Sequence, residues 1–150
     1  MPTLLDPSVA HEISARIDRL RPDSLALWGK MNANQMVCHL TDAFKVALGD
    51  TPTTLRPGPL SSKLARWLII SVLPVPRARA RTMREFKLTA PQVWAKDVQT
   101  LKGHMERFIA RAWEPNPQWN VHPAFGQLST TEYGKLVAKH MDHHLRQFGV

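Results

Sequence analysis

Cysteine is almost absent from this sequence. Its 150 residues include one, Cys38, so no disulfide can form within the chain, and this usage fits a reducing compartment. Long apolar runs are also lacking, because the longest, residues 67–73, is far shorter than the ~20 residues that a membrane span needs. The first six residues carry neither the basic start nor the apolar core of a secretory signal. We therefore expect a cytoplasmic protein that makes no membrane contact.

Strand-like alternation and internal repeats are lacking as well. Apolar residues recur instead at helical spacing, and a hydrophobic content of 43% in a chain of this length suits a single domain, 1–150, with one core. The long helices are predicted at 7–20, from an Asn32 or Asn34 cap to Leu48, from Thr89–Pro91 to a break at Glu114–Pro117, and from a Ser129–Glu132 capping box to Phe148. These elements favour an all-α four-helix bundle with at least one crossover connection.

The connection between the second and third long helices contains a short extra helix. Ser61 or Ser62 is its predicted cap, and it ends near Val72, before Pro74. Its inward-facing residues are predicted to be Leu64, Trp67, Leu68 and Val72. The stretch 77–88 that follows is either a long connector or a short extended pair.

Negative charge is scarce, with 12 acidic residues against 20 lysines and arginines and a formal net charge of +8. Part of the excess is local, because Arg77, Arg79, Arg81 and Arg84 alternate through one short segment. This segment is either a solvated connector or a contact for nucleic acid or an anionic ligand. No aromatic residue is interleaved through it, so it offers no stacking platform for a single strand, and nucleic acid is not the favoured partner.

Histidine, in contrast, is concentrated in one place. His140, His143 and His144 lie within five residues of the last predicted helix. His140 and His144 are four apart, so they project from nearly the same face, and neutral imidazoles at this spacing are typical of metal ligands. His143 lies at the edge of that face and competes with His144, but the four-residue step keeps two rings over one point. The alternative is a pair of core histidines that hydrogen-bond to other partners.

The second helix supplies a third histidine, His39, beside its apolar stripe. Gln35 and Asp42 flank His39 one turn away on either side, and either side chain is placed to orient an imidazole. Facing helices of a bundle bring such ligands together. The alternative is a hydrogen-bonded core histidine. His122, in the loop before the last helix, either reaches the mouth of this site or caps its own loop.

Four stretches resemble the DinB-like superfamily of metalloenzymes, closest to a subgroup whose function is not assigned: Trp28–Met31, Gln35–Ala43, His122–Gly126 and Lys139–Gly149. Residues 50–90 carry no such match. The resemblance implies a four-helix bundle of up-down-down-up topology, often a homodimer. It also implies a divalent metal, commonly zinc or nickel, bound by three histidines, which correspond here to His39, His140 and His144. His143 then becomes a neighbour of the last ligand.

Two hypotheses of function follow. The first is a metal-dependent enzyme acting on a small molecule, either a hydrolase in which the ion activates water or a thiol S-transferase that uses a low-molecular-weight thiol. Its acid–base candidates are Asp42 and His122. The second is a non-enzymatic binding protein with a structural or vestigial metal site, in which Arg77–Arg84 contacts nucleic acid or a protein partner.

Overall fold

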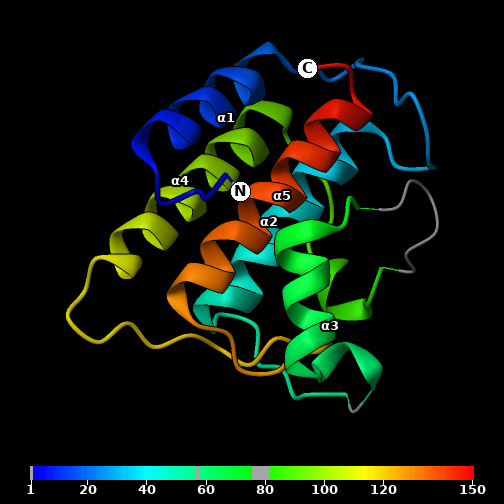
Figure 1. The fold of residues 1–150 in the computed structure, drawn as a ribbon. Coiled ribbons are helices and arrows are strands. Elements are labelled where there is room, and N and C mark those ends of the chain that lie inside the picture. Colours follow the sequence, from blue (N-terminus) through cyan, green and yellow to red (C-terminus); the bar gives the residue numbers. More distant parts are fainter. Residues whose placement is uncertain (1, 57, 76–81) are drawn as a thin grey trace.

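The computed structural model describes residues 2–56, 58–75 and 82–150, and these residues form helices and connecting loops without a β-strand (Figure 1). The expected all-α class is therefore confirmed. The elements are α1 (Pro7–Arg19), α2 (Ala33–Leu48), η1 (Pro59–Ser61), α3 (Lys63–Trp67), η2 (Leu68–Val72), η3 (Arg84–Phe86), α4 (Trp94–Ala112) and α5 (Thr130–Gln147). Across these described residues, no helix combines the length and apolar character needed to cross a bilayer.

Three of the four long helices begin where a side chain caps them. The carboxylate of Asp6 accepts the Ser8 N–H at the start of α1. Asn32 forms a reciprocal capping box with Gln35 at the start of α2, and Ser129 and Glu132 form another at α5. Each cap satisfies amide groups that the first turn leaves without partners, which fixes the helix start.

The core lies where α2, α4 and α5 meet, and α1 covers the outer side of α5 (Figure 1). Aromatic rings from all three helices fill it. Phe44 of α2 packs edge-on against Phe108 of α4 at 5.6 Å between ring centres, and Phe108 in turn contacts Tyr133 of α5 at 6.4 Å. This shared core fixes α2 against α5, which is the helix pair that carries the predicted metal ligands.

The third long helix begins later than the sequence indicates. It starts at Trp94 and not at Thr89–Pro91. The reason is that Thr89 is bound elsewhere: its N–H and hydroxyl both donate to the buried carboxylate of Asp42. The carboxylate of Asp97 then accepts the Gln92 N–H, so the residues before Trp94 form a capped loop.

The predicted inward face of the short helix is wrong for Leu64, Trp67 and Val72, which are exposed, while Leu68 is partly buried. Leu64 is 68% exposed and Trp67 56% exposed, whereas Ile70 is 1% exposed and enters the core. The sequence predicts one regular α-helix here, but α3 ends after five residues and continues as the π-turn η2. In that wider turn the Leu73 N–H donates to the Leu68 carbonyl, which changes which residue faces α5.

The stretch 77–88 is only partly described. Arg77, Arg79 and Arg81, and hence most of the basic segment, lie outside the described residues. Residues 84–86 form the 3-10 turn η3, which packs on α2, so this part is neither a plain connector nor an extended pair.

Candidate metal centre

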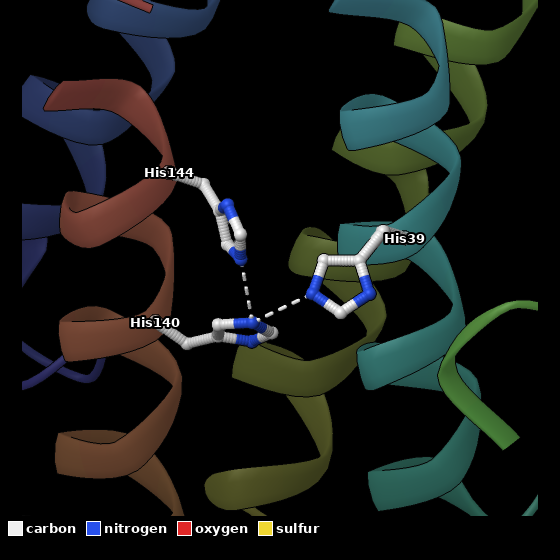
Figure 2. A group of neighbouring side chains, drawn as sticks. All are labelled: His39, His140 and His144. Atoms are coloured by element: carbon white, nitrogen blue, oxygen red, sulfur yellow. Dashed lines mark hydrogen bonds between the residues drawn. The ribbon is translucent and has the colours of Figure 1, made fainter. Parts of the chain in front are cut away.

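Three histidine side chains converge between α2 and α5. Figure 2 shows His39 from α2 facing His140 and His144 from α5. Nε2 of His140 lies 2.9 Å from Nε2 of His39 and 3.1 Å from Nε2 of His144. His39 and His144 are buried and His140 is partly buried. The structure therefore brings together the three residues that the resemblance to the DinB-like superfamily identifies as ligands.

The outer nitrogens of two rings are held by carbonyl oxygens. Nδ1 of His39 lies 2.8 Å from the Phe86 carbonyl, and Nδ1 of His144 lies 2.7 Å from Oε1 of Gln147. Because a carbonyl oxygen only accepts, each Nδ1 must carry the proton and donate it. In the neutral rings, Nε2 of His39 and of His144 therefore each present a lone pair to the centre of the group.

Burial keeps all three rings neutral. Desolvation is the main cause that lowers the pKa of His39, and it lowers the pKa of His144 to about 3, with further lowering by the charge of His39. The pKa of His140 lies well below its usual value, first from desolvation and then from the neighbouring imidazoles. Neutral imidazole is the form that binds metal, so no proton has to be removed at neutral pH.

The donor set fits a metal ion better than it fits a hydrogen-bonded group. Two of the three Nε2 atoms carry lone pairs, so only His140 has a proton to offer at the centre. With the proton on Nε2 of His140, that single hydrogen satisfies at most one of the two short nitrogen–nitrogen contacts. With the proton on Nδ1, the lone pairs of all three Nε2 atoms face one another. A divalent cation placed among the three nitrogens accepts all three lone pairs.

The two orienting residues suggested by the sequence are not the ones in the structure. Gln35 is bound in the capping box of α2, and Asp42 is fully buried beneath the loop at Leu88 and Thr89, whose N–H groups it accepts. The Phe86 carbonyl orients His39 in their place. A backbone carbonyl 47 residues away leaves no signal in the sequence.

The position of Gln147, which orients His144, can be recognised in the sequence. It follows His144 by three residues, a spacing at which side chains on one helix face meet. Its amide N–H donates to the Trp28 carbonyl at 2.6 Å, which turns Oε1 toward His144. The sequence places Gln147 on the histidine face without assigning it this contact.

The two acid–base candidates, Asp42 and His122, each hydrogen-bond to backbone N–H groups of nearby loops. The carboxylate of Asp42 accepts the N–H groups of Leu88 and Thr89 together with the Thr89 hydroxyl. Nδ1 of His122 accepts the N–H groups of Ala124 and Phe125, so this ring does cap its own loop. Neither residue belongs to the group of converging ligands.

The comparisons with known proteins give one family. The sequence matches the model of a family described as a protein of unknown function, DUF1569, over residues 5–149. No curated protein and no solved structure matches the chain. Because that description assigns no activity, the function has to follow from the geometry of the site.

Proposed function

The chain belongs to the DUF1569 family, and we propose that His39, His140 and His144 hold one divalent metal ion, zinc or nickel, at which a small molecule is transformed. One observation carries this proposal: Nε2 of His140 lies within hydrogen-bonding distance of Nε2 of His39 and of His144, while Nδ1 of His39 and of His144 each donate to a carbonyl oxygen. Histidine ligands that donate their other N–H to a carbonyl are a regular feature of metal sites.

The number of ligands favours chemistry over a purely structural role. Among the residues that the structure describes, the group contains three ligand side chains and no fourth. Structural zinc sites close four positions with protein ligands, whereas catalytic sites keep one position open. An ion with an open position supplies a Lewis acid and lowers the pKa of a water or thiol that binds there. We therefore favour a hydrolase or a thiol S-transferase.

The chain's own residues hold the ligands in place. The Phe86 carbonyl and Gln147 fix the two buried rings, and desolvation keeps them neutral. His140 is the least buried of the three residues. A ligand set held rigid and neutral in this way is prepared to bind a metal ion.

The competing proposal is a non-enzymatic binding protein with a structural or vestigial metal. It is favoured by Asp42, whose carboxylate is fully engaged with the loop at Thr89 and has no acid–base role left to fill. In this case Arg77–Arg84 contacts nucleic acid or a protein partner. Nucleic-acid affinity would then fall steeply with salt concentration, and an absence of binding at low ionic strength would exclude this form of the proposal.

Metal analysis tests the site directly. Protein purified without a histidine tag should contain about one divalent ion per chain. His140→Ala should abolish this content, because it removes the nitrogen common to both short contacts. His11→Ala, at an exposed position of α1, is the control and should leave it unchanged. Full occupancy in His140→Ala would refute the triad.

A thermal-shift screen then separates the reactions. Low-molecular-weight thiols should stabilise the metal-loaded protein and not the metal-free one if the ion binds a thiol. Stabilisation of both forms alike would argue against a thiol S-transferase and leave the hydrolase.

Three finer expectations remain proposals. They are the DinB-like assignment, the up-down-down-up order of a four-helix bundle, and a homodimer. The packing of α2 on α4 and α5, and of α1 on α5, supports the bundle. Sedimentation equilibrium of the purified protein tests the dimer.

A further inference from the structure

A cavity of about 340 Å³ lies beside the histidine group, on a neighbouring face of α5. One wall is apolar and comes from the end of η2 and the residues after it, Val72–Val75. The rest of the lining comes from Trp28 and from α5, with Lys139, Asp142, His143 and Arg146. The volume lies within the range of small-molecule sites in proteins.

The charged side chains around this cavity carry an excess of positive charge. The lining includes the cations Lys139 and Arg146 and the carboxylate of Asp142. Asp142 lies 3.0 Å from Nε of Arg146 and 2.8 Å from Nη1 of Arg16, which belongs to α1 and is not part of this lining. Two cations against one carboxylate leave the lining one positive charge in excess.

Lys139 is held at the apolar wall by two backbone carbonyl groups. Its ammonium donates to the carbonyl oxygens of Ile69, in η2, and Leu73, directly after it. Lys139 also lines the cavity, so its positive charge attracts an anion that enters there.

The cavity also adjoins the support of the metal ligands. The ring of His143 lies 5.1 Å from that of His144, centre to centre. The Trp28 carbonyl accepts the amide N–H of Gln147, and Gln147 in turn accepts the proton of His144. Two residues that line the cavity are thus in contact with the group that holds His144.

We propose that this cavity binds a small carboxylic acid with an apolar body. The carboxylate meets Arg146 and Lys139 on α5, and the apolar body lies against Val72–Val75 and Trp28. The inference goes beyond the proposed function, because binding here requires no metal ion. The further consequence, that such an acid is the substrate or cosubstrate of the metal site, does rest on the proposed function.

A second cavity is a competing binding site for such a ligand. It has about 310 Å³, lies on the α1 side of α5 and shares Lys139, Asp142 and Arg146 with the first. Its other wall includes Ile13 in place of Trp28. A ligand that merely follows the positive charge could therefore enter either cavity, and Trp28 and Ile13 report which one it enters.

The test uses phenylbutyrate as the probe and its uncharged amide, phenylbutyramide, as the matched control. NMR titrations at millimolar concentrations follow the indole N–H of Trp28, assigned with Trp28→Phe, and the methyl groups of Ile13. We expect the acid to shift Trp28 and the amide to bind at least about tenfold more weakly, the loss of one charge-assisted hydrogen bond. Equal binding of both, shifts confined to Ile13, or no shift with either compound would overturn the proposal.

Variants identify the cation that binds. Arg146→Gln should weaken phenylbutyrate binding about tenfold, for the same reason. Arg19→Gln, which removes the same charge from an exposed position of α1, should leave it unchanged. Equal losses in both variants would reduce the effect to net charge and overturn the site. The titrations are run on metal-free and metal-loaded protein, so a failure of the metal site is recognised separately.

Discussion

The side chain of Gln147 holds His144 in place, accepting its Nδ1 proton at 2.7 Å. The same amide donates to the Trp28 carbonyl at 2.6 Å, in the connector between α1 and α2. The backbone carbonyl of Gln147 also accepts the Leu27 N–H, so this connector is attached to α5 twice. The proposed ligand is therefore oriented by a segment more than 110 residues away in sequence, with one glutamine as the link.

The first prediction concerns this link. Gln147→Leu removes the acceptor for the His144 proton, so the ring loses both its orientation and its fixed tautomer. We expect metal affinity to fall about 10- to 100-fold, as in other sites that lose such a partner. A competition titration with a chromogenic chelator measures it. Gln99→Leu, the same change at an exposed position of α4, should bind metal like the unchanged protein, and an equal affinity in Gln147→Leu would contradict the role.

The second prediction concerns Gly29, which leaves room for the same amide. Its φ of +83° is a backbone conformation that glycine adopts more readily than other residues, and an added Cβ would lie 2.5 Å from Nε2 of Gln147. Gly29→Ala should therefore destabilise the fold by more than about 1 kcal/mol and lower metal affinity as well. Gly103→Ala in α4 meets no atom within 4 Å and should stabilise by about 0.5–1 kcal/mol. Urea unfolding of both variants, with the chelator titration, checks the contrast, and a Gly29→Ala variant as stable as Gly103→Ala would contradict it.

The third prediction is a pH dependence that comes from His122. Burial lowers the pKa of His122 to about 4 in the folded protein, against about 6.5 for an unfolded chain. Between these values the unfolded chain binds the extra proton, so stability must fall as the pH drops from about 6.5 to 4. The difference corresponds to about 3 kcal/mol from this residue.

His122→Asn is the matched variant for this measurement. Asparagine keeps an acceptor for the N–H groups of Ala124 and Phe125, which Nδ1 of His122 accepts, but it does not titrate. Metal-free protein should lose up to about 3 kcal/mol more than the variant on acidification from pH 7 to 4, in urea unfolding at each pH. Parallel stability curves would show that His122 contributes nothing to the acid sensitivity.

The part of this structure that the sequence predicts best is local. The caps at Asp6, Asn32 and Ser129 act within three residues, so they can be identified without knowing the fold. The ligands on α5 are predictable for the same reason, because a four-residue step on a helix fixes their common face. The start of α4 is not, since Thr89 is held by Asp42, which lies on another helix.

The same distinction between local and distant contacts applies to the metal site. Gln147 lies three residues from His144, so the sequence places it on the histidine face without identifying it as a partner, whereas the Phe86 carbonyl reaches His39 from another element. Every residue has a backbone carbonyl, so the sequence does not mark the one that accepts the hydrogen bond from His39. Sequence reasoning therefore chose Gln35 and Asp42, the nearest polar side chains on the same helix, although the structure employs both elsewhere.

The apolar face of α3 and η2 leads to the last prediction. Helical spacing locates the apolar residues of this segment but does not fix which of them face the core, and the π-turn brings in Ile70 while leaving Trp67 56% exposed. The Lys139 ammonium, which binds the Ile69 and Leu73 carbonyls, holds this orientation against α5.

Ile70→Ala should therefore lower the free energy of unfolding by about 2–5 kcal/mol, the usual range for a buried aliphatic truncation. Trp67→Ala should change stability by no more than about 0.5 kcal/mol, as at other exposed positions. Urea unfolding compares the two, and a greater loss in Trp67→Ala would mean that the indole, and not Ile70, anchors this segment.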